Sequence, residues 1–201
     1  MIRVLIAEDQ AMVRGALASL LGLEPDIEVA AQVSRGDDVL GAALSAQPDV
    51  ALLDIEMPGA TGLDAAEALA RELPSCRVLI LTTFGRPGYL RRAMEGGASG
   101  FVLKDAPASE LSSAIRRALR GERVVDPGLA AAALSQGESP LTPREREVLA
   151  ASREHATVAE LARALYLSPG TVRNHLSSVM QKLDARNRGE AVRVAEERGW
   201  L

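Results

Sequence analysis

The chain has 201 residues, a formal net charge of −4 and one cysteine, Cys76. This length suffices for one large domain or two small ones, and either can bury a hydrophobic core. No apolar run approaches about 18 residues, and an apolar strand pattern begins at once, so the sequence predicts neither a membrane span nor a signal peptide. A lone cysteine excludes an internal disulfide and a cysteine-based zinc site, and we therefore expect a reducing, cytoplasmic location.

The charge is distributed unevenly along the chain. Residues 1–139 contain 13 basic and 19 acidic residues, whereas residues 140–201 contain 10 basic and eight acidic residues. Within residues 168–188, four basic residues accompany a single acid. An acidic front and a locally basic end indicate that the two parts have different binding partners.

Residues 1–121 alternate short apolar runs with amphipathic helical patterns. The runs, each typical of a strand, are residues 4–7, 27–33, 50–53, 78–81 and 101–103, and the second of them alternates loosely. Apolar residues with helical spacing lie at residues 13–21, 38–46, 63–73, 89–96 and 111–119. Five strands alternating with five helices predict a flavodoxin-like α/β domain, with a five-stranded parallel sheet in the order 2-1-3-4-5.

The alternating pattern ends after residue 121. The next stretch is punctuated by proline and glycine around an Ala-rich patch, which predicts a linker with one short helix at most. The remaining pattern is helical, with helix starts at residues 142–145, 157–160, 168–169 and 187–190. We therefore predict an α/β domain at residues 1–121, a linker at 122–139 and a small all-α, four-helix domain at 140–201.

Four of the predicted strands lead into polar residues that can bind metal or phosphate. These residues are Glu8 and Asp9, Asp54, Thr82 and Lys104. Because the carboxyl ends of parallel strands meet at one edge of the sheet, we expect these side chains to converge. Close carboxylates repel one another unless a cation intervenes, and oxygen ligands from Asp9, Asp54 and the backbone carbonyl of Glu56 suit Mg²⁺. Glu8 would then orient a metal-bound water.

A carboxylate in this position can act as a nucleophile toward a phosphoryl donor. Attack by Asp54 gives an aspartyl phosphate, with Mg²⁺ and Lys104 neutralising the phosphoryl oxygens and the Thr82 hydroxyl binding the same group. No histidine base is needed, because a carboxylate is already ionised at neutral pH. Each residue taken alone is more often a solvated loop residue, but agreement among four strand ends favours the functional interpretation.

This set of residues resembles the receiver domain of two-component response regulators over residues 1–121. The resemblance implies that Asp54 is the phosphoacceptor and that Glu8 and Asp9 are the paired acids beside it. It also implies that Lys104 is the family's lysine. Thr82 and Phe101 would form its hydroxyl–aromatic switch pair. In such a switch the hydroxyl moves toward the phosphoryl group and the ring turns inward. Phe84 is either a core residue or part of the same signalling region. Many receivers have proline after the lysine, where this chain has Asp105.

The pattern at residues 169–183 predicts an amphipathic helix with two distinct faces. The apolar face carries Val172, Leu176, Val179 and Leu183. The opposite face carries small polar and amide side chains flanked by cations, which suit the DNA major groove. A shorter helix at residues 158–165 and a turn at 166–168 complete a helix-turn-helix pattern. An ordinary solvated helix is the alternative that the pattern alone leaves open.

Three stretches resemble the DNA-binding domain of the NarL/FixJ/LuxR class: L-T-P-R-E-R-E-V-L at 141–149, L-S-P-G-T-V-R-N-H-L at 167–176 and Q-K-L at 181–183. The resemblance implies base contacts from Arg173, Asn174 and Ser177. It also implies phosphate contacts from Ser168, Thr171, His175 and Lys182. Relatives usually have a glycine in the turn at residues 153–156, where this chain has none, so the conformation of that turn is open.

The two resemblances together predict a DNA-binding transcription regulator rather than an enzyme. A sensor histidine kinase would phosphorylate Asp54, and the product would form a homodimer that binds promoter DNA and engages RNA polymerase. Relatives suggest the first and fifth helices as the dimer interface, although the apolar stripe at residues 111–119 suits the core of the monomer equally well.

Residues 6–10, 54–59, 81–89 and 199–201 resemble regulators of this class that work with a membrane-embedded kinase to control a fatty-acid desaturase. Two other classes of function stay open from the residues. One is an aspartyl-phosphate phosphatase with Glu56 as its second acid, and the other is a metal-binding or docking module.

Overall fold

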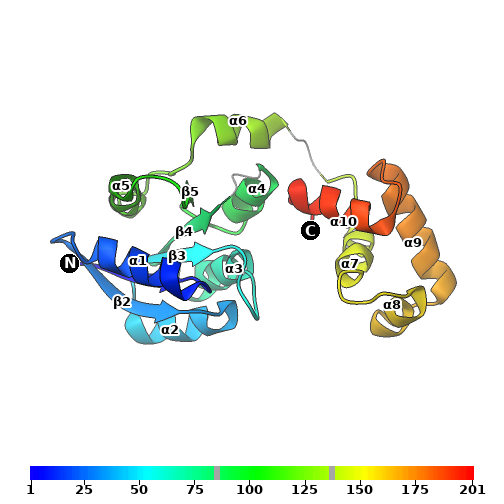
Figure 1. Cartoon of the computed structure of the whole chain (residues 1–201), viewed down its shortest axis with the longest axis horizontal. Coiled ribbons are helices and arrows are strands. Elements are labelled where there is room, and N and C mark those ends of the chain that lie inside the picture. The colour runs from blue at the N-terminus through cyan, green and yellow to red at the C-terminus, as the bar shows by residue number, and fades with distance from the viewer. Residues whose placement is uncertain (84–86, 136–138) are drawn as a thin grey trace. The chain divides into compact units, whose positions relative to one another are not determined.

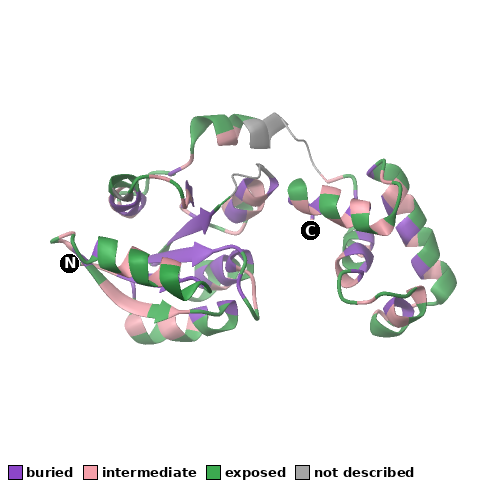
Figure 2. Ribbon diagram, in the orientation of Figure 1, coloured by how far each residue is buried: buried purple, intermediate pink, exposed green. Residues whose placement is uncertain are grey.

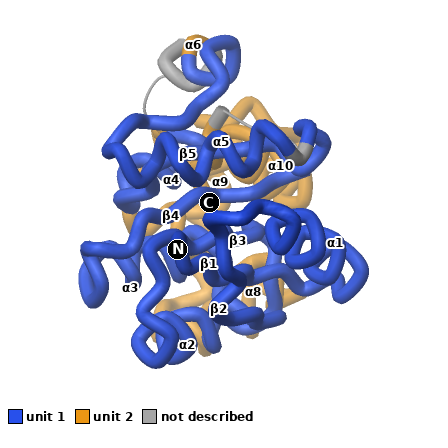
Figure 3. Tube along the Cα trace, turned by 90° about the vertical axis from the view of Figure 1, so that its left-hand side faces the viewer, with its two compact units in different colours: residues 1–85, 90–130 blue, residues 86–89, 131–201 orange. Residues whose placement is uncertain are grey.

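The computed structural model describes residues 1–83, 87–135 and 139–201; Phe84 therefore lies outside the described residues. The chain divides into two compact units, which Figure 3 distinguishes by colour. Unit 1 comprises residues 1–85 and 90–130, and unit 2 comprises residues 86–89 and 131–201. Among the described residues, no helix has the length and apolar character that crossing a membrane requires.

Unit 1 is built on a five-stranded, fully parallel sheet (Figure 1). The strands are β1 (Ile2–Ala7), β2 (Ile27–Val33), β3 (Val50–Asp54), β4 (Arg77–Thr82) and β5 (Gly100–Leu103). The helices that connect and follow them are α1 (Ala11–Leu21), η1 (Gly36–Asp38), α2 (Val39–Ala46), α3 (Gly62–Glu72), α4 (Pro87–Glu95) and α5 (Ala108–Leu119). The order β2-β1-β3-β4-β5 confirms the predicted flavodoxin-like topology.

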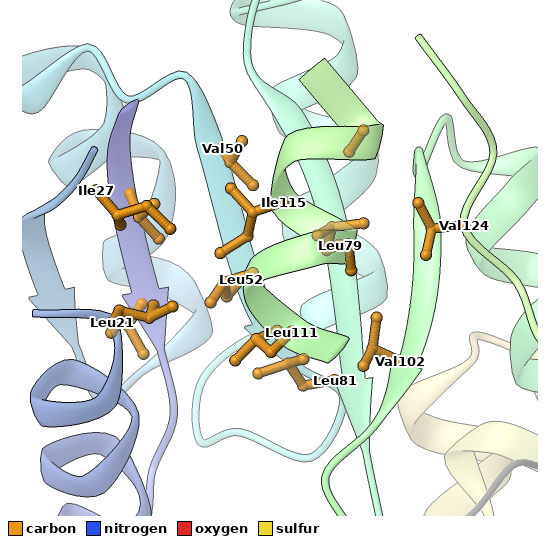
Figure 4. Packing of buried hydrophobic residues seen from close by; sticks show 14 residues of the cluster. Leu21, Ile27, Val50, Leu52, Leu79, Leu81, Val102, Leu111, Ile115 and Val124 are labelled. Atoms are coloured by element: carbon orange, nitrogen blue, oxygen red, sulfur yellow. The ribbon is translucent and has the colours of Figure 1, made fainter. Parts of the chain in front are cut away.

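The main core of unit 1 lies between one face of the sheet and helices α1 and α5 (Figure 4). Leu111 and Ile115 of α5 point from the helix toward the central strands. On the opposite face, Leu5, Leu53 and Ile80 are also fully buried. Burial on both faces explains why these strands appear in the sequence as continuous apolar runs. The apolar stripe of α5 belongs to this core, as the monomer interpretation expected.

The compact part of unit 1 continues beyond residue 121. The N–H of Val124 donates to the carbonyl of Ser99 at 3.1 Å, and its carbonyl accepts from the N–H of Phe101 at 2.7 Å. Val124 thereby forms a parallel bridge with Gly100 and is buried in the core. The beginning of the predicted linker is thus paired with β5, and the Ala-rich patch after it forms α6 (Pro127–Ser135).

The C-terminal part of unit 2 is a small helical domain. Its helices are α7 (Pro143–Ala151), α8 (Val158–Ala164), α9 (Pro169–Lys182) and α10 (Arg188–Glu197). A side-chain oxygen caps the N-terminus of each helix, and the capping residues are Thr142, Thr157, Ser168 and Asn187. Buried and exposed segments alternate along α9 (Figure 2), and its predicted apolar stripe is buried.

The turn between α7 and α8 forms without a glycine. The N–H of His155 donates to the carbonyl of Ala151 at 3.2 Å, and the guanidinium of Arg188 donates to the carbonyl of His155 at 3.1 Å. No residue of 153–156 has a positive φ, so none needs the conformational freedom of glycine. The departure from the family pattern therefore leaves the helical domain intact.

Candidate functional site

Glu8, Asp9 and Asp54 converge at the carboxyl ends of β1 and β3. One carboxylate oxygen from each residue lies within 4.8 Å of the other two. β1 and β3 are adjacent, and Ala7 pairs with Leu53, which brings the two strand ends side by side. Glu8 and Asp54 are buried, whereas Asp9 is exposed. The structure thus brings together the three acids that the sequence singled out.

Lys104 joins the two buried acids. Its Nζ lies 2.7 Å from the carboxylate of Glu8 and 3.0 Å from that of Asp54. Burial raises the pKa of both carboxyl groups, and the hydrogen bonds from Lys104 oppose that rise. Burial alone would lower the pKa of Lys104, but its bonds to the two carboxylates outweigh this effect and raise it. The lysine therefore stays protonated between its two partners.

The backbone around the paired acids is fixed by α1. The guanidinium of Arg14 donates to the carbonyl of Glu8 at 2.6 Å, and the N–H of Gln10 donates to the carboxylate of Glu8 at 3.3 Å. Arg14 was not predicted from the sequence, because an arginine in the first turn of a helix carries no signal that its side chain reaches back to the preceding strand. Its contact becomes visible only with the tertiary structure.

The loop after Asp54 packs closely against the strand end, and Gly62 makes this possible. A Cβ atom at Gly62 would lie 1.9 Å from the carbonyl oxygen of Asp54. The N–H of Gly62 also donates to the carbonyl of Ile55 at 3.0 Å, which closes the loop. Glu56, whose carbonyl was predicted to bind metal, is exposed in this loop.

This donor set fits a small, hard divalent cation. Carboxylate and carbonyl oxygens are the ligands that Mg²⁺ prefers, and Mg²⁺ retains several waters at a site with few protein ligands. Three carboxylates carry more negative charge than Lys104 can neutralise, so a divalent cation would relieve their repulsion. The cluster is typical of a Mg²⁺ site.

The predicted switch residues lie on the two strands beside this cluster. Thr82 ends β4, and its carbonyl accepts a hydrogen bond from the N–H of Lys104 at 2.8 Å. Phe101 lies opposite Ile80 in the register of β4 and β5. The Phe101 side chain is buried, with 3% of the residue exposed. The ring is therefore covered in this structure, and the switch role of Phe101 stays a prediction.

The predicted base-reading residues lie together on the exposed face of α9. Arg173, Asn174 and Ser177 are all exposed, and His175 is half-buried beside them. Two of the predicted phosphate contacts are at the helix start, where the Ser168 hydroxyl lies 2.8 Å from the Thr171 hydroxyl and accepts from the Thr171 N–H at 3.0 Å. The Ser168 hydroxyl therefore caps the helix, and the Thr171 hydroxyl is bonded to that cap.

Lys182 has a partner within the domain. Its Nζ lies 2.6 Å from one carboxylate oxygen of Glu145 in α7, and the Ser178 hydroxyl donates to the other oxygen at 2.6 Å. Burial alone would raise the pKa of Glu145, but the bonds from Lys182, Ser178 and Thr142 lower it to about 2. The sequence assigned Glu145 only to a local capping box, so this tie between α7 and α9 was not foreseen. The phosphate contact of Lys182 stays a prediction.

Comparison with known proteins identifies both parts of the chain. Residues 4–116 match the response regulator receiver domain, and residues 139–195 match the luxR family of bacterial regulatory proteins. The chain is 48% identical to the uncharacterized transcriptional regulatory protein YvfU of Bacillus subtilis, and the match covers 100% of both chains. The chain belongs to the LuxR-class response regulators.

Two further relatives agree with this assignment. The response regulator is 46% identical to the transcriptional regulatory protein DesR of Bacillus subtilis, again over 100% of both chains. The crystal structure of the response regulator ChrA, from a heme-sensing two-component system, matches 100% of this chain and 98% of its own. That match has 35% sequence identity and a TM-score of 0.56.

Family membership decides between the classes of function that the residues left open. This response regulator is a two-component transcription regulator with a LuxR-type DNA-binding domain, and not a classical enzyme. The cluster of Glu8, Asp9 and Asp54 is consistent with the phospho-aspartate site of a receiver. The phosphatase and the docking module are therefore set aside.

Proposed function

We propose that this response regulator is switched by phosphorylation of Asp54 by a sensor histidine kinase. The observation that carries the proposal is the convergence of three carboxylates and Lys104 at one sheet edge. Asp9, Asp54 and the Glu56 carbonyl would hold Mg²⁺, with Glu8 binding one of its waters. When bound, Mg²⁺ would supply positive charge to the phosphoryl oxygens.

The reaction uses the chain's own residues as nucleophile and clamp. A carboxylate oxygen of Asp54 attacks the phosphorus atom, and the phosphorus–nitrogen bond to the donor histidine breaks. The imidazole leaves with the electron pair and takes up a proton from solvent. The Lys104 ammonium, already 3.0 Å from Asp54, pairs with a phosphoryl oxygen. The Thr82 hydroxyl donates a hydrogen bond to another.

The signal leaves the site along β4 and β5. The added charge, about −2 by analogy with phosphoserine, draws Thr82 toward the phosphoryl group and biases a two-state receiver toward its active form. Phe101 responds on the neighbouring strand. Because its N–H is bonded to the carbonyl of Val124, a shift of β5 also moves the segment that leads to α6.

The output is a homodimer that presents two copies of α9 to promoter DNA. Three apolar residues on and just after α1, Met12, Leu20 and Leu23, are 85%, 43% and 81% exposed and support a dimer interface there. The apolar stripe of α5 is used in its own core, so α5 would contribute its outward-facing residues. Arg173, Asn174 and Ser177 would read bases, and RNA polymerase would be a further partner in the cytoplasm.

The target pathway stays a prediction. Identity to DesR is 46% and identity to YvfU is 48%, so the likeness does not select one of these relatives. We keep control of a fatty-acid desaturase by a membrane-embedded kinase as the hypothesis that the sequence motifs suggested. Sequencing the genomic DNA bound by the phosphorylated protein would test it directly.

Phosphorylation by a small donor tests the chemistry without the kinase. With acetyl phosphate and Mg²⁺, we expect one phosphoryl group per chain by intact mass, and none in Asp54→Asn. Asp38→Asn, which changes an exposed acid in η1, serves as the matched control and should label as the wild type does. Labelling of Asp54→Asn at full stoichiometry, or steady turnover of small phosphoesters, would refute the proposal.

A further inference from the structure

The turn between α8 and α9 closes α8 with a Schellman motif. The N–H of Leu167 donates to the carbonyl of Ala162 at 2.8 Å, and the N–H of Tyr166 donates to the carbonyl of Arg163 at 3.3 Å. This pair of bonds places Tyr166 in the left-handed region, with φ +54°. Glycine usually occupies this position, because a Cβ atom makes the left-handed conformation unfavourable.

Three other helix ends in the chain follow this rule, whereas α2 ends with Gln47 at φ +46°. Helices α4, α5 and α10 end in the same pair of hydrogen bonds, with Gly97, Gly121 and Gly199 at positive φ. Helix α9 ends likewise with Asp184, a residue type with a short polar side chain that tolerates the left-handed region better than most. Among the described residues, Tyr166 is the aromatic residue with positive φ.

The side chain of Tyr166 gives the fold nothing that compensates for this conformation. The residue is 96% exposed, whereas the adjacent Leu167 packs against the core formed by α7, α8 and α9. The fold thus uses Leu167 as the apolar anchor of the turn and leaves the phenol ring in water. A strained backbone that carries a solvent-exposed aromatic side chain indicates a function outside the fold.

We propose that Tyr166 is a DNA-contact residue, whose phenolic hydroxyl donates a hydrogen bond to a backbone phosphate. This inference rests on the DNA-binding function proposed above. Tyr166 precedes the Ser168 cap of α9 by two residues, and the N-terminal residues of a recognition helix lie nearest the base edges. The turn before that helix therefore borders the phosphate backbone. Tyrosine is a common hydrogen-bond donor to backbone phosphates in protein–DNA interfaces, and it adds no charge.

Binding to mixed-sequence DNA tests the contact, because phosphate contacts act on any sequence. The full-length protein, incubated with acetyl phosphate and Mg²⁺, is titrated into fluorescein-labelled duplexes of mixed sequence across a range of salt concentrations. We expect Tyr166→Phe to weaken binding roughly three- to tenfold, as for the net contribution of a typical hydrogen bond. The slope of log affinity against log salt should not change, since no cation is lost.

A second variant separates a DNA contact from a structural role. Tyr166→Gly should weaken DNA binding at least as much as Tyr166→Phe. Its unfolding temperature, followed by the fluorescence of Trp200, the sole tryptophan, should be no lower than that of the wild type, because glycine suits the backbone. Asp184→Gly is the matched control: it makes the same backbone change at the end of α9 and should not weaken DNA binding.

Two results would overturn this inference but not the proposed DNA-binding function. One is wild-type DNA affinity in both Tyr166 variants. The other is a loss of affinity in Tyr166→Gly but not in Tyr166→Phe, accompanied by a lowered unfolding temperature of Tyr166→Gly. Failure of the wild-type protein to bind any duplex would overturn the proposed DNA-binding function, and this inference with it.

Discussion

At the residue scale, the acidic site depends on one lysine shared by two buried carboxylates. Lys104 compensates part of the charge of Glu8 and Asp54, whose pKa values burial raises. Phosphorylation of Asp54 would replace a singly charged partner of Lys104 with a group that carries about two negative charges. The Lys104 ammonium would bind this phosphoryl group more strongly than the carboxylate. The resting ion pair thus already holds Lys104 in place for the phosphorylated state.

The exposed face of α9 leads to a prediction about sequence recognition. Arg173 is exposed on that face, and arginine commonly forms two hydrogen bonds to guanine. Arg173→Ala should therefore reduce the ratio of specific to non-specific affinity by about 1–3 kcal/mol. Competition between operator and random duplexes measures this ratio. Equal losses on both kinds of DNA would assign Arg173 to the phosphate backbone instead.

The bond between Glu145 and Lys182 predicts a pH dependence of stability. Because the pKa of Glu145 falls from its ordinary 4.5 to about 2 on folding, its contribution is present above pH 4.5 and is lost as pH falls toward 2. The unfolding temperature reported by Trp200 should fall over that interval in the wild type. In Glu145→Gln the fall should be smaller.

Lys182→Ala distinguishes the two roles considered for this lysine. Removal of a charged partner from the buried Glu145 should lower the free energy of unfolding by about 1–3 kcal/mol. A lysine that only contacts phosphate would leave stability unchanged and would weaken DNA binding alone. Both losses together would mean that Lys182 serves the fold and the DNA contact.

The candidate site shows which residues a sequence can reveal. Glu8, Asp9, Asp54, Thr82 and Lys104 could be found because each follows a strand pattern, and parallel strands end at one edge. Arg14 and the tie between Glu145 and Lys182 could not be found in this way. Their partners are far away in the sequence or lie on the backbone, where no periodic pattern reports them.

At the element scale, β5 links the site to the segment after α5. It carries Phe101, the predicted switch aromatic, and its backbone bonds hold Val124 beside Gly100. The close approach requires glycine, since a Cβ atom at Gly100 would lie 2.6 Å from the carbonyl oxygen of Val124 and 2.7 Å from the side chain of Leu79. This pairing is the physical connection through which a shift of β5 would reach α6.

Gly100→Ala should therefore separate Val124 from β5. We expect it to lower the free energy of unfolding by about 1–3 kcal/mol, as overpacking does, and to reduce the effect of phosphorylation on DNA binding. Gly41→Ala in α2 is the matched control, because a Cβ atom there meets nothing within 4 Å and alanine favours a helix. Chemical denaturation measures the stability of both variants. Equal stability of the two variants would contradict the role of the pairing.

Element types were easier to predict than element ends. Continuous apolar runs identified the strands β1, β3, β4 and β5, whereas the edge strand β2 was identified from a loosely alternating pattern. The predicted linker boundary at residue 121 did not anticipate Val124, since a single valine after a helix carries no periodic signal. Tertiary pairing with Gly100, rather than local propensity, makes it part of unit 1.

At the scale of the whole molecule, the chain combines an acidic input with a DNA-binding output. The net negative charge of residues 1–139 does not oppose DNA binding, because only the contact face of α9 needs to be basic. The acidic site alone could be explained by metal binding. Its covalent connection to a LuxR-type domain supports our proposal that it is a switch, in which the state of Asp54 controls DNA affinity.

DNA affinity before and after phosphorylation tests this claim most directly. The wild-type protein and Asp54→Asn are each titrated into the promoter duplex recovered from genomic binding, with and without acetyl phosphate and Mg²⁺. We predict that acetyl phosphate increases the affinity of the wild type at least tenfold, on the order of 1.4 kcal/mol of coupling, and leaves Asp54→Asn unchanged. Equal affinity of the phosphorylated and unphosphorylated wild type, or an equal gain in Asp54→Asn, would contradict the account.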